Sequence, residues 1–460
     1  MVLVISVHKA ILRCAHAIRL RRKLGRPAVR SGATQLCLLR ILLIGLICPF
    51  VLLGCAGLAV VYSKSSVDLQ PRVDLPILIR TLGSDGQFAQ VSSTAVAEQL
   101  RELHAEEPLN ILALSGGGAD GAFGAGAVAG LTSSGSRPNF AVVTGVSVGA
   151  LIAPYAFLGP TWDDRLREAF TAEAGENLLQ SRGLVGAIFG SSLYRGEPLR
   201  HRVDAYLSDT MIQAVAREAE KGRFLLVATT DVVTGMSVVW DLGAIARNGG
   251  PRARELFRDV LVASASVPGM FPPVTIRVNK DGEPHDEAHV DGSTTTPFFV
   301  PEAFLQSPPE SPDGTNRAAV YVIIDGSLGD APQATRLTTG AIVSRSIHAG
   351  LNHMLLSNLE LMAAKAELRG ATLQYSAVPA THPRGDDFDF GPDRMRPLFR
   401  YAYECAQARR LWTPFGRIDE GSGATPGIAE AQKVQCPSDD ALIREFASRH
   451  DNPNQVVVVR

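Results

Sequence analysis

Two apolar runs of strand-like length are each followed by a sharp glycine-containing turn and then by a helix-like segment. The first run, residues 109–114, leads through glycines into a helix of small residues predicted over 122–131. The second, residues 140–144, leads into an apolar helix predicted over 148–157. Strands that alternate with helices in this way predict an α/β layer fold with a mainly parallel central sheet.

Further strand and helix signals extend this pattern to both sides. Strands are predicted at 224–229, 237–240, 274–278, 288–290 and 320–324, with a hairpin tip at 279–286, a surface loop at 307–316, helices at 93–104 and 338–366, and a late strand at 455–459. The hydrophobic content of 46% in 460 residues is ample for a large core. A formal net charge of −1 argues against a generally basic nucleic-acid binder.

The near-zero net charge hides a strong asymmetry. Residues 1–55 contain nine Lys or Arg and no Asp or Glu, so the remainder of the chain carries about −10. Residues 41–61 lack charged side chains and follow this basic stretch. That arrangement is typical of a signal peptide or a membrane anchor, and 21 apolar residues are just long enough to span a bilayer.

Four of the six cysteines lie in the first 55 residues. The segment Leu52-Leu53-Gly54-Cys55 resembles the lipobox of bacterial lipoproteins, although Leu53 stands where a small residue is usual. The resemblance implies that Cys55 is lipidated; the alternative is that Cys55 belongs to an uncleaved apolar anchor. Either arrangement predicts a membrane-anchored envelope protein facing the periplasm. In an oxidising compartment Cys405 and Cys436 either pair or remain as free buried thiols.

The turn after the second run reads Gly145-Val146-Ser147-Val148-Gly149, a G-x-S-x-G between a strand and a helix. Small flanking residues let the backbone turn sharply and raise the serine hydroxyl above a helix N-terminus. The pattern predicts Ser147 as a nucleophile; a plain tight turn is the alternative.

The turn after the first run is rich in glycine and reads Ser115-Gly-Gly-Gly-Ala-Asp-Gly121. Converging backbone N–H groups of Gly116, Gly117 and Gly118 can stabilise an oxyanion at a helix N-terminus. The same letters fit the dinucleotide pattern G-x-G-x-x-G, but no Asp or Glu occurs between Gly121 and Asp163 to bind a ribose. An oxyanion hole is therefore the favoured interpretation.

Two Asp-Gly dipeptides follow apolar strands, at Asp291-Gly292 and at Asp325-Gly326. Either aspartate can reach the edge of the sheet where Ser147 is expected. From the strands alone the choice between them stays open.

The motifs taken together resemble the patatin-like phospholipases, which have a glycine-rich oxyanion loop, a G-x-S-x-G serine and a downstream D-G-[AG] in this order. The stretch 263–273, ASASVPGMFPP, resembles the family's A-S-x-A-x-P-x-x-F-P-P, which precedes the catalytic aspartate. The resemblance covers roughly 109–305 and implies a patatin-like layered fold. It implies that Asp291, rather than Asp325, is the catalytic aspartate.

The resemblance divides the chain into a leader at 1–55, a spacer at 56–108, a catalytic core at 109–305, and a remainder at 306–460 that holds the rest of the sheet and a helical C-terminal extension. Two positions depart from the family loop D-G-G-G-x-R-G: Ser115 replaces its aspartate and Asp120 its arginine. Backbone donors do not depend on these side chains, whereas any role of the family arginine is in doubt. Ser293 follows Gly292 where the family has Ala or Gly.

The resemblance implies a lipid acyl hydrolase with a Ser147–Asp291 dyad, an acyl-enzyme intermediate, a membrane lipid substrate and no cofactor. One alternative is a Ser-Asp-His esterase of the α/β-hydrolase type, for which His348 and His353 come late enough in the chain. Another is a catalytically silent lipid-binding envelope protein. His289 is assigned to the opposite strand face from Asp291 and to a structural role. No His or Cys pairs show zinc spacing, so no metal site is expected.

Overall fold

The computed structural model describes residues 78–82, 88–103, 109–172, 178–183, 191–280, 283–305, 318–328, 337–379, 382 and 388–414. All of them belong to a unit that spans residues 71–460. The leader with Cys55, the loop at 307–316, Cys436 and the expected late strand lie outside the described residues. Within the described ranges, no helix combines the length and the apolar composition that a membrane crossing needs.

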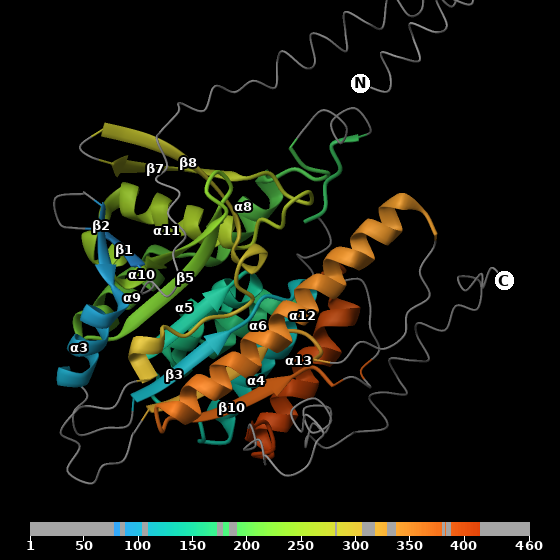
Figure 1. Ribbon diagram of the computed structural model, residues 1–460. Helices are drawn as coiled ribbons and strands as arrows, with labels where there is room; N and C mark the ends of the chain where they lie inside the picture. Colours follow the sequence, from blue (N-terminus) through green and yellow to red (C-terminus); the bar gives the residue numbers. More distant parts are fainter. Residues whose placement is uncertain are drawn as a thin grey trace, which may run out of the picture. The chain divides into compact units, whose positions relative to one another are not determined.

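One mixed sheet forms the centre of the described structure (Figure 1). Its strands run in the order β11-β10-β9-β3-β4-β5-β6-β1-β2, and a hairpin of β7 and β8 joins it through β5. From β10 to β5 all neighbours are parallel, which confirms the mainly parallel sheet predicted from the sequence. The strands are β1 (Leu78–Leu82), β2 (Phe88–Ser92), β3 (Leu109–Leu114), β4 (Val142–Val146), β5 (Phe224–Asp231), β6 (Met236–Asp241), β7 (Val274–Lys280), β8 (Glu283–Asp291), β9 (Ala318–Ile324), β10 (Thr372–Ala377) and β11 (Thr413–Pro414).

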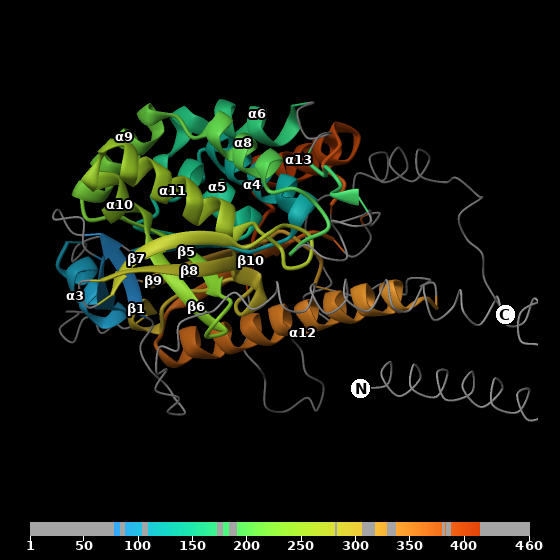
Figure 2. The ribbon, with the colours of Figure 1, turned by 90° about the horizontal axis from the view of Figure 1, so that it is seen from above.

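Helices cover both faces of this sheet. Figure 2 shows α12 along one face and α4, α5, α11 and α13 on the other. The helices are α3 (Ser93–Leu103), α4 (Gly121–Ser133), α5 (Val148–Leu158), α6 (Asp163–Thr171), α8 (Glu197–Tyr206), α9 (Asp209–Glu220), α10 (Leu242–Asn248), α11 (Gly250–Ser264), α12 (Thr339–Leu368) and α13 (Pro392–Gln407). The fold is thus a layered α/β structure with C-terminal helices, as expected.

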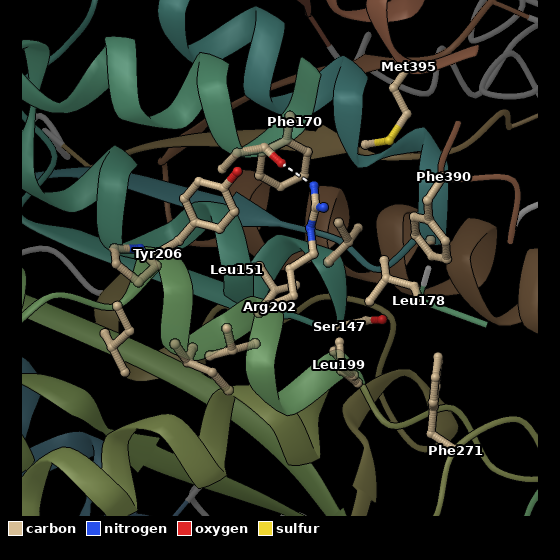
Figure 3. A pocket seen from close by; sticks show the side chains of 18 of the residues that line it. Ser147, Leu151, Phe170, Leu178, Leu199, Arg202, Tyr206, Phe271, Phe390 and Met395 are labelled. Atoms are coloured by element: carbon tan, nitrogen blue, oxygen red, sulfur yellow. Dashed lines mark hydrogen bonds between the residues drawn. The ribbon is translucent and has the colours of Figure 1, made fainter. Parts of the chain in front are cut away.

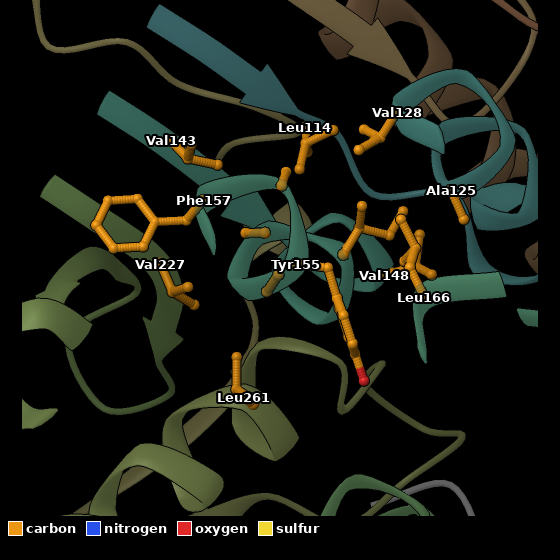
Figure 4. Packing of buried hydrophobic residues seen from close by; sticks show 14 of the residues in the cluster. Leu114, Ala125, Val128, Val143, Val148, Tyr155, Phe157, Leu166, Val227 and Leu261 are labelled. Atoms are coloured by element: carbon orange, nitrogen blue, oxygen red, sulfur yellow. The ribbon is translucent and has the colours of Figure 1, made fainter. Parts of the chain in front are cut away.

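The alternation of side chains along each strand divides the core in two. In β3, Leu112 and Leu114 belong to the apolar cluster that includes α4, α5 and α13, whereas Ile111 and Ala113 belong to the cluster that includes α3 and α12. Successive strand residues point to opposite faces, and here both faces are buried. Figure 4 shows Leu114, Val143 and Val227 of three neighbouring strands packed around α5. This double burial fixes the strand ends that bear the site.

Residues 78–103 differ from the expectation of a spacer. They form the β1–β2 hairpin and α3, and β1 pairs in parallel with β6. Ile79 and Leu100 are fully buried in the core, and Arg80 forms an ion pair with Glu287 of β8. The sequence signal was weak because these edge strands are short and carry polar residues.

Element ends differ where a strand is polar. The hairpin tip expected at 279–286 is narrower, because β7 reaches Lys280 and β8 begins at Glu283. The outer half of β8 is polar and largely exposed, so it shows no apolar run. Helices α6, α8, α9, α10, α11 and α13 and strands β10 and β11 were not predicted individually.

Candidate active site

Ser147 stands at the turn between β4 and α5. Its backbone has φ 55° and ψ −125°, one of two positive φ values among the described non-glycine residues. Non-glycine residues rarely adopt such angles, and strain of this kind concentrates at functional sites. The serine is the N-terminal cap residue of α5 and is only 6% exposed. The G-x-S-x-G sequence therefore forms the strained elbow that it predicts.

The two glycines of the motif are required by close packing. A Cβ added to Gly145 would lie 2.6 Å from the carbonyl oxygen of Gly149. One added to Gly149 would lie 2.5 Å from the carbonyl oxygen of Ser115. A larger residue at Gly145 would push away the first turn of α5, and one at Gly149 would push α5 away from the start of the glycine-rich loop.

Ser264, from the ASAS stretch, holds the backbone of the Ser147 turn in place through hydrogen bonds. The backbone N–H of Ser147 donates a hydrogen bond to Ser264 Oγ at 3.0 Å, and Ser264 Oγ donates to the carbonyl of Ala228 at 2.7 Å. Ser264 ends α11 and is fully buried. The stretch that supported the family resemblance thus has a structural role at the site itself.

Asp291, the last residue of β8, contacts the serine directly. The hydroxyl of Ser147 donates to Asp291 Oδ2 at 2.6 Å, and the backbone N–H of Ser293 donates to Asp291 Oδ1 at 2.8 Å. Burial raises the pKa of Asp291 to about 6, although the hydrogen bonds from Ser147 and Ser293 oppose the increase. The carboxyl group is 2% exposed and is poised as a proton acceptor near neutral pH.

The glycine-rich loop offers fewer free donors than the sequence suggested. The N–H of Gly116 donates to the carbonyl of Pro297 at 3.1 Å and is therefore occupied, which corrects its predicted role as an oxyanion donor. The N–H groups of Gly117 and Gly118 have no partner among the described residues. Gly118 has φ 58° and lines the same cavity as Ser147. These two N–H groups remain as the candidate oxyanion donors.

The remaining motif glycines allow elements to approach one another closely. A Cβ on Gly121 would lie 2.2 Å from Val148 Cγ2, and one on Gly292 would lie 2.4 Å from the carbonyl oxygen of Ala228. Gly121 thus brings the start of α4 against the start of α5. Gly292 lets the chain after Asp291 pass against β5.

Asp325, the other candidate base, has a different set of partners. Its Oδ1 accepts a hydrogen bond from the N–H of Gly124 in α4 at 2.8 Å, and its own N–H donates to Ser115 Oγ at 2.9 Å. Burial raises the pKa of Asp325 well above its ordinary range. It makes no hydrogen bond to Ser147; it holds the glycine loop and α4 together.

Asp120, which stands where the family loop has an arginine, forms an ion pair with a residue of the C-terminal helix α13. Arg394 of α13 is 4% exposed and donates from Nη2 to Asp120 Oδ1 at 2.6 Å. The family loop has an arginine at this position, whereas here the loop carries the carboxylate and α13 carries the guanidinium. The C-terminal extension therefore stabilises the start of α4, which sequence reasoning missed.

No histidine contacts the pair of Ser147 and Asp291 among the described residues. His289 is fully buried, with Nδ1 3.0 Å from Thr229 Oγ1 and Nε2 3.0 Å from Glu287 Oε2. Residues two apart in a strand share a face, so the assignment of His289 to the opposite face from Asp291 was wrong; its structural role rests on these occupied nitrogens. His353 is exposed on α12.

An apolar cavity of about 110 Å³ adjoins the serine (Figure 3). It runs between one face of α5, with Leu151 and Tyr155, and one face of α8, with Leu199 and Tyr206. The spacing of three to four residues on each helix brings these side chains to one side. That spacing at 199–206 was a signal that sequence reasoning did not use.

Arg202 of α8 is the one Lys or Arg side chain among the cavity-lining residues. Its Nη2 donates to the carbonyl of Ala169 at 2.8 Å, and its guanidinium lies 5.6 Å from the ring centre of Tyr206. Burial lowers the pKa of Arg202, partly offset by Tyr206 and Tyr155. The described part of the chain contains no group of three His, Cys, Asp or Glu residues arranged to hold a metal ion.

Residues 112–304 match the family model for patatin-like phospholipases, a range that includes both Ser147 and Asp291. The crystal structure of VipD from Legionella pneumophila is similar at 10% identity and a TM-score of 0.27, over 76% of this chain and 73% of that one. No curated protein matches the sequence. The family match implies a hydrolase that acts on lipid esters, and residues 112–304 of this chain form a patatin-like phospholipase domain.

Proposed function

We propose that the protein hydrolyses acyl esters of glycerolipids, phospholipids in particular, through a Ser147–Asp291 dyad. The observation that carries the proposal is the 2.6 Å hydrogen bond from the serine hydroxyl to a buried carboxylate, beside an apolar cavity. A nucleophile, its base and a site for an acyl chain thus meet at one point. The match to the lipid-hydrolase family supports the same chemistry.

In the first half of the reaction Ser147 Oγ attacks the ester carbonyl while its proton passes to Asp291 Oδ2. The N–H groups of Gly117 and Gly118 stabilise the negative charge that develops on the carbonyl oxygen. The protonated Asp291 then gives its proton to the leaving alkoxide, and the acyl group stays on Ser147. One alcohol leaves and one ester bond to the enzyme has formed.

In the second half a water molecule attacks the acyl-serine and gives its proton to Asp291. The tetrahedral intermediate collapses, the fatty acid leaves and Ser147 Oγ regains the proton. The raised pKa of Asp291 favours both transfers, because a base works best when its pKa lies near the working pH. The apolar walls between α5 and α8 hold the acyl chain by burying its methylene groups.

The test is hydrolysis of p-nitrophenyl esters and of phospholipid in mixed micelles by the purified protein. Ser147→Ala is expected to abolish both activities, and Ser357→Ala, an exposed serine on α12, serves as the matched control. A fluorophosphonate probe is expected to label Ser147 and to lose that label in Asp291→Asn. A wild type that is no faster than Ser147→Ala would contradict the proposal.

The proposal includes a location in the cell envelope, where the leader tethers the domain to a membrane through lipidated Cys55. Its support is the basic stretch followed by the apolar run and the lipobox-like residues 52–55. Radiolabelled palmitate is expected to enter the wild type and not Cys55→Ser. Labelling of both proteins would contradict the tether and leave the enzymatic proposal intact.

A further inference from the structure

Helix α12 is much longer than the strands it connects. It has 30 residues and joins the parallel strands β9 and β10, of which β9 has seven. The helix is therefore about 45 Å long, whereas the strand spans about 23 Å. About half of the helix must extend beyond an edge of the sheet.

The topology determines which edge this is. The C-terminal end of α12 returns to the start of β10, so the excess length lies at its N-terminal end, beyond the end of β9. Strands β9, β3 and β4 are parallel, and Ser147 follows the end of β4. The overhanging half therefore leaves the sheet at the same edge that bears the serine. Figure 1 shows the N-terminal end of α12 extending past the strands.

The two halves of α12 differ in burial. Its buried side chains, among those described, all lie from Leu355 onward: Leu355, Leu359, Met362, Ala363 and Ala366. Polar contacts tie the second half to the chain after β8: Asn358 donates to the carbonyl of Phe298, and Lys365 forms an ion pair with Glu302. Arg369, directly after the helix, pairs with Glu302 as well. The second half is thus a regular layer helix.

The overhanging half exposes large aliphatic side chains. Ile342, Val343 and Ile347 are 46%, 52% and 59% exposed. At 100° per residue these three positions lie within about 140° of one another around the helix. They therefore form one apolar stripe, which we call the overhang stripe.

The charge of this segment is opposite to that of the body. Residues 331–359 contain no Asp or Glu, but include Arg336, Arg345, His348 and His353. Residues 56–460 as a whole carry about −10. A helical segment with an apolar stripe, basic side chains and no carboxylates has the composition of an interfacial membrane helix.

We propose that residues 339–353 dock on a lipid bilayer, with the overhang stripe inserted among the lipids and anionic headgroups beside the basic side chains. The purpose given to docking rests on the proposed function. Docking would bring the edge of the sheet that bears Ser147 to the bilayer, from which the lipid substrate enters. The exposed aliphatic side chains, together with the apolar cavity beside Ser147, favour a lipid surface as the occupant.

Tryptophan quenching by brominated lipid tests the insertion. The full chain is reconstituted in phosphatidylcholine vesicles that contain phosphatidylglycerol, with Ile347→Trp as the probe. Leu361→Trp is the matched control, because Leu361 is 53% exposed on the same helix but lies over the sheet. Brominated phosphatidylcholine is expected to quench the Ile347→Trp signal strongly, and the Leu361→Trp signal no more than that of the wild type. The comparison holds even when the leader alone keeps the protein on the vesicle.

Kinetics provide the second readout. Ile342→Asp with Ile347→Asp is expected to lower hydrolysis of vesicle phospholipid about tenfold, because the inserted aliphatic groups are replaced by charges. Hydrolysis of a soluble p-nitrophenyl ester is expected to stay at the wild-type rate, and Leu361→Asp is expected to change neither activity.

Equal quenching in the two tryptophan variants would overturn the docking proposal, as would an equal loss on soluble and vesicle substrates. Quenching needs no hydrolysis, so it tests docking even if no lipid ester is cleaved. Failure of the proposed function would appear instead as wild-type hydrolysis no faster than that of Ser147→Ala on every substrate.

Discussion

The ends of β8 and β9 have the same sequence pattern, but their aspartates have different roles. Each strand is apolar near its end and continues into Asp-Gly, and burial raises the pKa of both aspartates. Asp291 accepts a hydrogen bond from the hydroxyl of Ser147, whereas Asp325 accepts one from the backbone N–H of Gly124. Burial alone therefore does not make a carboxyl group a base. Its hydrogen-bond partner decides whether a raised pKa serves proton transfer or the joining of two elements.

The largest expected effect separates the two aspartates by activity. Asp291→Asn removes the proton acceptor of Ser147 and is expected to lower kcat for ester hydrolysis about 10²–10⁴-fold. Asp325→Asn is expected to remain close to the wild-type rate, because an amide oxygen can still accept the Gly124 hydrogen bond. The reverse ranking of the two variants would refute the choice of Asp291 as base.

The pH dependence of kcat/KM sharpens the same contrast. Asp291 must be ionised to accept a proton, and its pKa is raised to about 6. Activity is therefore expected to fall as the pH decreases through 6, by about tenfold for each further unit. Asp325→Asn is expected to show the same acidic limb as the wild type. If the acidic limb of the kcat/KM profile shifts to another pH in Asp325→Asn, the titrating group is Asp325.

The ion pair of Asp120 and Arg394 tests the structural side of the comparison. Arg394→Met leaves Asp120 without this guanidinium beside the glycine loop, and is expected to lower kcat about tenfold through misplaced oxyanion donors. Combining Asp120→Arg with Arg394→Asp is expected to recover part of the loss by restoring the pair in the reverse order. Additive losses in this double-mutant cycle would show that the two residues are not coupled.

The smallest expected effect concerns stability at the end of β9. Asp325→Ala removes the buried hydrogen bond that joins the end of β9 to Gly124 of α4, which is expected to lower the free energy of unfolding by about 0.5–1.5 kcal/mol. Asp325→Asn keeps an acceptor and is expected to lose less. Urea unfolding of the two variants measures the difference, and equal losses would contradict the role given to the hydrogen bond.

Prediction from sequence succeeded where local rules act. The β3 and β4 turns, the G-x-S-x-G elbow and the helices after them depend on short-range glycine and apolar patterns. Prediction failed where residues meet from distant segments. The N–H of Gly116 is occupied by Pro297, and Asp120 by Arg394 from a helix 274 residues later. The sequence of the glycine-rich loop contains no pattern that predicts Pro297 or Arg394 as a partner.

The sequence by itself determined the order of strand, glycine turn and helix, and with the family resemblance it identified Ser147 and Asp291. Those features follow from backbone sterics and from the burial of both faces of a parallel sheet, which act on neighbouring residues. Only the tertiary structure decided which glycine N–H groups are free, how Asp325 is used and which part of α12 overhangs the sheet. These depend on contacts and lengths in three dimensions, because a hydrogen-bond donor is free or occupied according to what folds against it.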